Sequence, residues 1–385
     1  MLKIFDNPGD VPKRRTCMLM VTHSCNLHCS YCYESHKDGC MMSPKYAMEL
    51  IAREVKYVQN SDEFDELEID FMGGEPLMNF DLIKYVVETL ASNPPPIPFI
   101  CFATTNGTLL TPERKEWFEK YADYVWLGAS YDGNPEAQKI NRGLDEHRVD
   151  YEFFHKVWPL QGFKLTISKE SLPTLASGII SAQKKGYALA ASLAQGVDWT
   201  DEDAMEYSRQ LKILEEEYLK DETLRPINLL TRSLEGLNKL SEPQCRFCGS
   251  GHGMITYDVD GTRYGCHMFA PITLGDKALP LEKTSFKTND FEDPHCANCC
   301  LKQYCPTCLG FNYRYRGNMA KRDIRWCKMI LAEALASCEF QIRVLTSRRE
   351  KLNEVEAYYA QYALKAYPLL SQFSMATSQS PYVIC

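Results

Sequence analysis

Three cysteines lie close together near the start of the chain, in the stretch VTHSCNLHCSYCYES at 21–35. Cys25, Cys29 and Cys32 form a C-x3-C-x2-C array, with Tyr31 just before the last cysteine. Three is an unusual number of clustered thiols, because a structural zinc site needs four ligands and a disulfide framework needs an even count. Three thiolates can instead hold three irons of a 4Fe–4S cluster and leave the fourth iron open. The array therefore predicts an iron–sulfur site at which a further ligand can bind.

The overall composition places this array in a globular, acidic protein. The chain has 385 residues, 17 cysteines and a formal net charge of −8, and its longest basic run is PKRR at 12–15. Two domains are expected at this length, and a partner held by nucleic-acid phosphates is disfavoured by the charge. The sequence has neither a signal peptide at its start nor an apolar run of about 18 residues, so we expect no membrane association. A cytoplasmic location follows, where thiols stay reduced and metal binding explains so many cysteines.

Strand-like apolar runs alternate with helical patterns over the first 221 residues. Strands are expected at 16–22, 67–72, 99–105, 124–130, 163–168 and 187–193. Helices are expected at 43–60, 80–92, 111–123, 134–142, 151–158, 171–185 and 200–221, the first and third beginning at Ser-Pro and Thr-Pro caps. Six β/α units in succession predict an α/β fold with a parallel sheet covered by helices. Six units rather than eight favour a partial (β/α)6 barrel that is open on one side.

Polar or glycine-rich motifs follow each of the first four strands. The cysteine array follows the first strand, GGEP (73–76) the second, TNG (105–107) the third and SYDGNPEAQKINR (130–142) the fourth. In folds of this kind the carboxyl ends of the strands carry the chemistry. GGEP or TNG alone is usually just a turn. Because all four motifs come in order, each after its strand, we expect them to converge on one rim.

The chain resembles the radical SAM enzymes at these positions. Their hallmark is C-x3-C-x-aromatic-C after the first strand of a partial (β/α)6 barrel, and Cys25, Cys29, Tyr31 and Cys32 match it position for position. The resemblance implies that S-adenosylmethionine (SAM) binds the open iron through its amino and carboxylate groups. It also implies that one electron from the cluster yields a 5′-deoxyadenosyl radical, which abstracts a hydrogen atom from the substrate.

The same resemblance assigns roles to the other rim residues. Gly73, Gly74 and Glu75 look like the GGE motif that receives the methionine ammonium, and glycines let the backbone approach closely. Asn106 and Ser130 fall where family members contact the methionyl or ribose part of SAM. Tyr33, just past the array, is expected near the adenine.

A second group of cysteines lies further along the chain. It begins with CRFC, continues through two strand-like runs joined by Asp260-Gly261, a hairpin turn signal, and ends after CANCCLKQYCPTC. By themselves, C-x2-C pairs with later cysteines are typical of zinc ribbons, so a non-catalytic zinc-binding scaffold is an open alternative.

Behind a radical SAM barrel the second group resembles the SPASM extension, which binds two auxiliary 4Fe–4S clusters. The resemblance implies auxiliary cluster I on Cys245, Cys248, Cys266 and Cys308, and auxiliary cluster II on Cys296, Cys299, Cys305 and Cys327. Together with the SAM-binding cluster this makes three clusters. One spacing departs from the family pattern: two residues separate Cys305 from Cys308 where the family has three, so the neighbouring Cys300 is an alternative ligand.

These assignments divide the chain into three parts. We expect a radical SAM partial barrel at 1–240, a SPASM auxiliary-cluster domain at 241–330, and a C-terminal helix or helix pair with a mobile tail at 331–385. The helical run at 330–367 is expected to pack back on the barrel. Cys17 and Cys101 lie in apolar strands and are predicted core residues.

The predicted function is a radical SAM peptide maturase. SPASM proteins as a group act mostly on peptides or proteins, which implies a peptide substrate, an oxidative crosslink (thioether or carbon–carbon) and an external one-electron reductant such as flavodoxin or ferredoxin. The alternative is an anaerobic sulfatase-maturing, formylglycine-generating enzyme. Those enzymes carry an Asp after the cysteine that corresponds to Cys266, whereas this chain has His267 there. The difference favours peptide crosslinking over formylglycine formation. His267 is a candidate catalytic residue by position only.

Overall fold

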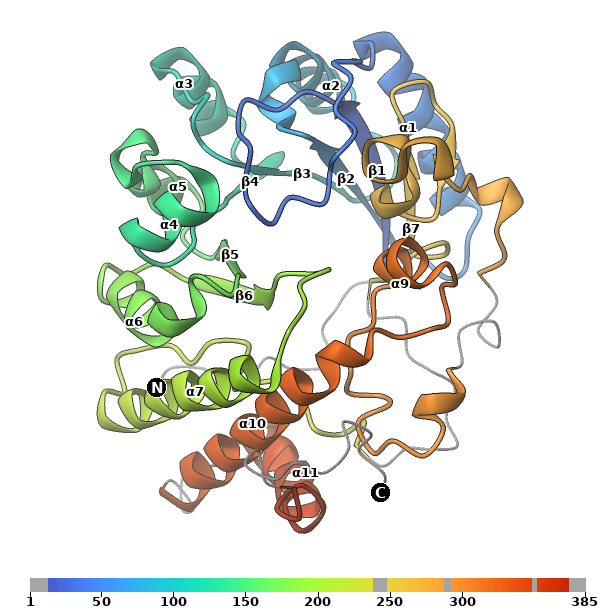
Figure 1. The fold of residues 1–385 in the computed structure, drawn as a ribbon. Helices are drawn as coiled ribbons and strands as arrows, with labels where there is room; N and C mark the ends of the chain where they lie inside the picture. The colour runs from blue at the N-terminus through green and yellow to red at the C-terminus, as the bar shows by residue number, and fades with distance from the viewer. Residues whose placement is uncertain (1–12, 238–247, 287–292, 348–351, 374–385) are drawn as a thin grey trace.

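The structure is a computed structural model, and it describes residues 13–237, 248–286, 293–347 and 352–373. Six parallel strands follow one another along the first half of the chain, as the apolar runs predict (Figure 1). Strands β1 to β4 pair in sequence order, and β5 pairs with β6. A single bridge between Ser130 and Lys164 links the two groups of strands. The strands are β1 (Arg14–Thr22), β2 (Glu66–Gly73), β3 (Phe99–Thr105), β4 (Val125–Ala129), β5 (Phe163–Ile167) and β6 (Leu189–Leu193).

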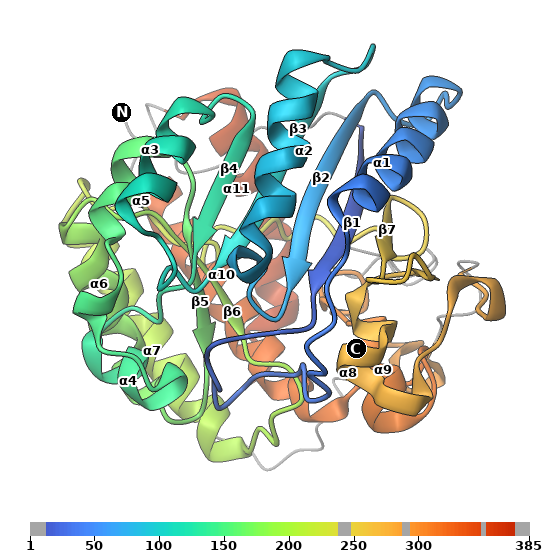
Figure 2. The same ribbon diagram turned by 90° about the horizontal axis from the view of Figure 1, so that it is seen from above.

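Helices cover the outer face of these strands, which makes the partial barrel that the sequence predicts (Figures 1 and 2). Ser43 and Thr111 accept hydrogen bonds at the starts of α1 and α3, and each is followed by Pro at the first helical position, as their sequences require. The helices of the barrel are α1 (Pro44–Gln59), α2 (Phe80–Ser92), α3 (Pro112–Lys120), α4 (Pro135–Arg142), α5 (Tyr151–Val157), α6 (Leu175–Lys184) and α7 (Asp201–Lys220).

Alternation along each strand separates the core from the interior of the barrel. In β2, Leu67, Ile69 and Phe71 are buried toward the helices, whereas Asp70 lies on the opposite, inner face. Cys17 and Cys101 are fully buried, which confirms them as core residues.

The cysteine-rich region continues the sheet of the barrel. Strand β7 (Met254–Tyr257) pairs in parallel with β1, and β8 (Arg263–Tyr264) pairs antiparallel with β7 around the Asp260-Gly261 turn. Beyond β8 this region contains two short helices, α8 (Pro271–Leu274) and α9 (Leu309–Arg316), and several single turns of 3-10 helix. Strand β7 thus joins the cysteine-rich region directly to the sheet of the barrel.

Two helices end the described chain. The helix pair consists of α10 (Cys327–Ser347) and α11 (Glu354–Leu370), which pack on one another, and α10 packs on α7. The predicted packing of this run against the barrel is therefore confirmed. Within the described residues, no helix combines the length and the apolar character needed to span a membrane.

Candidate active site

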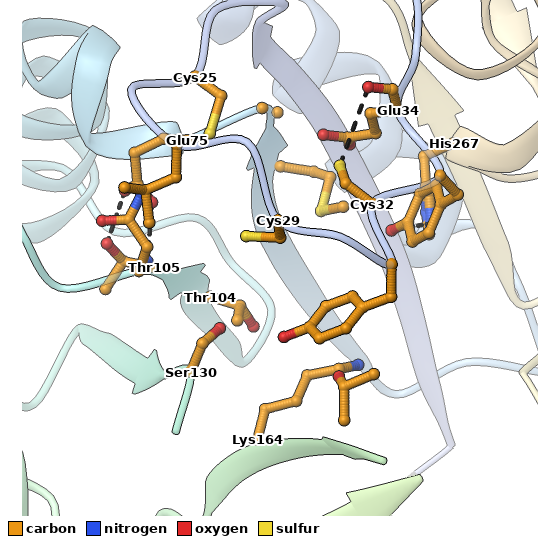
Figure 3. Close-up of a pocket in the computed structure, with 18 of the residues that line it drawn as sticks. Cys25, Cys29, Cys32, Glu34, Glu75, Thr104, Thr105, Ser130, Lys164 and His267 are labelled. Atoms are coloured by element: carbon orange, nitrogen blue, oxygen red, sulfur yellow. Dashed lines mark hydrogen bonds between the residues drawn. The ribbon is translucent and has the colours of Figure 1, made fainter. Parts of the chain in front are cut away.

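The three-cysteine array lies on the long loop between β1 and α1, at the carboxyl end of the barrel (Figure 3). The base of this loop is held by His23, whose Nδ1 lies 2.9 Å from Asp38 and whose Nε2 lies 2.6 Å from Asp258. Thr22 donates a hydrogen bond to the carbonyl of Cys40, which closes the loop. Asp258 follows β7, so the cysteine-rich region helps to position the array.

The thiols of the array face a cavity of about 420 Å³. Burial raises the pKa of Cys25, and it raises the pKa of Cys29 to about 11, with the neighbouring thiols Cys32 and Cys25 adding to the effect. Thiols that resist ionisation in this way become thiolates when they bind a metal. A cavity of this size accommodates a small-molecule cofactor with room beside it.

The GGEP motif forms the next part of the rim. The Gly74 and Glu75 amides donate to the carbonyls of Thr22 and Ser24. A Cβ on Gly74 would lie 2.4 Å from the Ser24 carbonyl oxygen, so only glycine fits this contact between the motif and the cysteine loop.

Glu75 is buried and lies in a network of donors. Its carboxylate accepts hydrogen bonds from Thr105 Oγ1 at 2.6 Å, the Asn106 amide at 2.8 Å and the Leu77 amide at 3.1 Å. Burial raises the pKa of this carboxyl, and these donors oppose the rise. Asn106 also bonds to Asn26 on the cysteine loop. The structure thus brings together the predicted residues of the second and third motifs, and Ser130 of the fourth lines the same cavity.

Two residues of the fourth motif extend the site beyond what we predicted. Asp132 is buried and accepts hydrogen bonds from Tyr31 and Arg142. Arg142 lines the cavity, and its guanidinium lies 5.4 Å from the centre of the Tyr31 ring. Tyr31, the predicted aromatic residue of the array, is therefore held in place by the hydrogen bond that its hydroxyl donates to Asp132. The charged Arg at the end of SYDGNPEAQKINR is the signal that could have identified Arg142.

His267 of the cysteine-rich region lies across the cavity from Glu75 (Figure 3), and Tyr33 lines the cavity beside His267. The Tyr33 hydroxyl lies 3.0 Å from His267 Nε2, and His267 Nδ1 lies 3.2 Å from Met18 Sδ. Burial lowers the pKa of His267 to about 4, so the imidazole is neutral at neutral pH. Arg314 of α9 donates to the Tyr33 carbonyl, which ties this wall to the array.

Two charged side chains reach into the barrel below the rim. Asp70 of β2 and Lys164 of β5 line the cavity, and burial raises the pKa of Asp70 to about 7. Burial also lowers the pKa of Lys164, while Asp70 acts in the opposite direction. Sequence reasoning missed both residues, although a charge at an inner position of an apolar strand is a readable signal.

The second set of cysteines forms two groups in space. Cys248, Cys266 and Cys308 lie within each other's electrostatic influence, and Cys245 falls outside the described residues. The other group surrounds a smaller cavity at the start of α10 and contains Cys296, Cys299, Cys305 and Cys327.

Cys300, the alternative ligand for the first group, is buried and disulfide-bonded. The described thiols that were assigned to each cluster from the sequence are neighbours in space. That they hold clusters remains a prediction.

The thiols offer one type of donor to a metal. Among the described residues, no three Cys, His, Asp or Glu side chains converge closely enough to hold one metal ion. Thiolates bind both tetrahedral zinc and the corners of iron–sulfur clusters.

The sequence and the fold both match known proteins. Residues 19–150 match the radical SAM superfamily. The radical SAM cyclopropyl synthase TigE of Paramaledivibacter caminithermalis is 30% identical over 27% of this chain and 24% of its own length. A probable GTP 3′,8-cyclase of Methanococcus maripaludis is 38% identical over 45% of this chain and 44% of its own length. The chain thus spans under half the length of these two relatives.

Solved structures extend the likeness to most of the chain. The structure of anSMEcpe with bound AdoMet and a peptide aligns over 87% of this chain and all of its own, with a TM-score of 0.64 at 16% identity. Streptococcus suis SuiB bound to the precursor peptide SuiA aligns over 80% of this chain and 75% of its own, with a TM-score of 0.53 at 15% identity. At these identities the likeness concerns the fold. Residues 19–150 thus carry a match to the radical SAM superfamily, and the fold of most of the chain is the one found in these solved structures.

Proposed function

We propose that this protein is a radical SAM peptide maturase that forms an oxidative crosslink, thioether or carbon–carbon, in a ribosomally made peptide. The observation that carries the proposal is the single cavity in which the array, the Glu75 network and His267 meet. When bound there, SAM and its cluster supply a carbon-centred radical that takes a hydrogen atom from the substrate. The two further cysteine groups support the oxidative part, because a crosslink needs an acceptor for one more electron.

Different side chains of the cavity bind different parts of the cluster and of SAM. Cys25, Cys29 and Cys32 hold the cluster, and Glu75, fixed by Thr105 and the Asn106 amide, accepts from the methionine ammonium. Gly73 and Gly74 allow the backbone to approach it, while Ser130 and Asn106 face the methionyl or ribose part. Tyr33 closes the adenine side against His267.

Two auxiliary clusters complete the proposal. Cys245, Cys248, Cys266 and Cys308 hold one, and Cys296, Cys299, Cys305 and Cys327 hold the other. Such clusters fit the cytoplasm, where a flavodoxin or ferredoxin supplies the electron.

Formylglycine formation is the second candidate, and the cavity disfavours it. That reaction in the resembled enzymes uses an Asp where His267 stands. Both ring nitrogens of His267 are already in contact, one with Tyr33 and one with Met18, so neither is presented to a substrate. A general base must lie within hydrogen-bond reach of the proton that it takes.

The test begins with iron, zinc and acid-labile sulfide per chain after anaerobic reconstitution. About twelve irons with matching sulfide, at four per cluster, are expected. The reconstituted enzyme, given SAM, a reductant and candidate peptides, should release 5′-deoxyadenosine and leave a peptide lighter by two hydrogens. Zinc without iron would overturn the proposal in favour of a scaffold. Formylglycine in a sulfatase peptide, with no crosslink in any other, would favour the second candidate.

A further inference from the structure

Lys164 has no hydrogen-bond or ion-pair partner inside the barrel among the residues that the structure describes. It stands on β5 between Phe163 and Leu165, which are buried toward the helices, so alternation directs its side chain inward. Figure 3 shows the Lys164 side chain extending from its strand into the cavity, on the same side as Ser130. Its ammonium makes no hydrogen bond or ion pair with any residue in the described part of the chain. The Lys164 side chain is exposed to the open cavity, so its ammonium is accessible to an anion there.

The other two cationic side chains that line the cavity, Arg142 and Lys37, already have partners. Arg142 is paired with Asp132 at 3.2 Å, and the Lys37 ammonium lies 3.8 Å from Cys32 Sγ at the rim. Asp70 is the carboxyl that most affects Lys164, yet the two do not form an ion pair. They stand on β2 and β5, with β3 and β4 between them, so the width of the barrel keeps them apart.

Asp70 lies deeper in the barrel than the glycine rim, whereas Lys164 is bridged to Ser130 just after β4. Asp70 precedes Gly73 by three residues on β2, which places its backbone about 10 Å below the glycine rim at about 3.3 Å per residue. Phe102 pairs with Asp70 in the neighbouring strand and lines the same part of the cavity. A group bound between Asp70 and Lys164 would therefore reach deeper into the barrel than Gly73, beside the Phe102 ring.

We propose that Lys164 and Asp70 form a binding site for a carboxylate of the substrate, in which Lys164 binds the anion and Asp70 weakens its hold enough for release. The proposal rests on the function proposed above and adds a substrate class, a peptide with an acidic group close to the reacting residue. A lysine ammonium is a compact point charge, which suits a single carboxylate. That carboxylate comes either from an Asp or Glu side chain or from a peptide C-terminus.

The first experiment selects peptides from a randomised library on the reconstituted full-length enzyme with SAM present. Wild type and the surface control Lys156→Gln, whose side chain is exposed and paired with Glu119, should enrich an acidic residue at one position or a free C-terminus. Lys164→Gln should lose this enrichment, and Lys164→Glu should select Lys or Arg there instead. Amidated and free-ended versions of the selected peptides distinguish the two carboxylate sources. Unchanged selection in both Lys164 variants would overturn the proposal.

The second experiment does not depend on a peptide reaction. Calorimetric titration of the same SAM-loaded enzyme with N-acetylglutamate amide should show binding about tenfold weaker in Lys164→Gln and a few-fold tighter in Asp70→Asn. If carboxylate binding depends on Lys164 but no peptide is ever modified, the maturase proposal is wrong and the carboxylate site is supported. If peptides are crosslinked without any dependence on a carboxylate, the maturase proposal is supported and the carboxylate site is wrong. Weaker SAM binding in Lys164→Gln, with carboxylate binding unchanged, would assign Lys164 to SAM and overturn the proposal.

Discussion

The two cysteine-bearing regions of this molecule are built in opposite ways. The array at the barrel rim lies on a loop whose ends are fixed by β1, by His23 between two carboxylates, and by the Glu75 network. The cysteine-rich region has two short strands, two short helices and single helical turns around its thiols. In the first region the fold positions the thiols, whereas in the second few regular elements surround them, so a bound metal would supply much of the order. Metal binding is folding free energy in regions of that kind.

The largest effect is expected from removing a thiol of the array. Cys29→Ala should abolish SAM cleavage, by more than a thousandfold, because the cluster loses one of its three protein ligands. Release of 5′-deoxyadenosine measures the loss. Cys40→Ser is the matched control, since Cys40 is exposed on the same loop and belongs to no cysteine group. Equal loss in both variants would mean that the loop itself, and not the array, is being disturbed.

Removing thiols from the cysteine-rich region should stop formation of the crosslinked peptide without stopping SAM cleavage. Cys296→Ala with Cys299→Ala removes two thiols of the smaller cavity, so about four irons should be lost and crosslinked peptide should disappear. SAM cleavage should stay within several-fold of wild type because the barrel rim is intact. A lower thermal midpoint should accompany the iron loss, since this region relies on its metal. Retained product would remove the auxiliary cluster from the reaction.

A pair of glycines tests whether the fold positions the array. Gly74→Ala puts a Cβ 2.4 Å from the Ser24 carbonyl and 2.9 Å from Cys25 Cβ, so the cysteine loop must move and iron content at the rim should fall. Gly143→Ala meets no atom within 4 Å and only strains a backbone with φ of +64°, at about 1 kcal/mol. Iron per chain and the unfolding midpoint measure the two effects. Similar iron content in both variants would contradict the tight contact.

A smaller effect is expected from changing Thr105, which holds the Glu75 carboxylate in place. Thr105→Val removes the 2.6 Å hydrogen bond to the buried Glu75 carboxylate and keeps the side-chain shape. One bond to a charged group is worth about 1.5–3 kcal/mol, so SAM affinity should fall by about tenfold or more while iron content is unchanged. Thr89→Val, which removes a hydrogen bond to the Tyr85 carbonyl on the exposed face of α2, is the control. A loss of iron instead would show that Thr105 supports the cysteine loop.

The smallest effect is a pH dependence inside the barrel. The Asp70 carboxyl has a pKa raised to about 7, against about 3.9 in an unfolded chain, so the folded state holds a proton that the unfolded chain releases. Stability from this proton is present below about pH 4 and is lost as the pH rises through 7. Asp70→Asn should therefore stabilise the enzyme by about 1 kcal/mol more at about pH 8 than at about pH 5, allowing for water in the cavity. Thermal midpoints of the reconstituted protein at both values measure the difference, and a gain equal at both pH values would contradict the raised pKa.

Local patterns in the sequence predicted most of the fold. Period-two and helical runs predicted the six barrel strands and seven helices, and Asp260-Gly261 predicted the β7–β8 pair. Contacts between distant segments were not predictable in this way. The pairing of β7 with β1 joins residues more than two hundred positions apart, and no periodicity encodes a partner. The candidate site divides similarly: the rim motifs were identified, whereas Arg142, Asp70 and Lys164 were not.

The sequence by itself determined the chemistry that the rim can carry. Three thiols at fixed spacing, followed by GGEP and TNG after successive strands, allow an iron–sulfur site with an open position because the carboxyl ends of parallel strands meet at one edge. Only the tertiary structure decided which charges are free to meet a substrate. Arg142 is neutralised by Asp132 and His267 is enclosed by Tyr33 and Met18, while Lys164 is left facing the cavity. A charge is committed or available according to its neighbours in space, and those neighbours come from strands and loops that the chain order keeps apart.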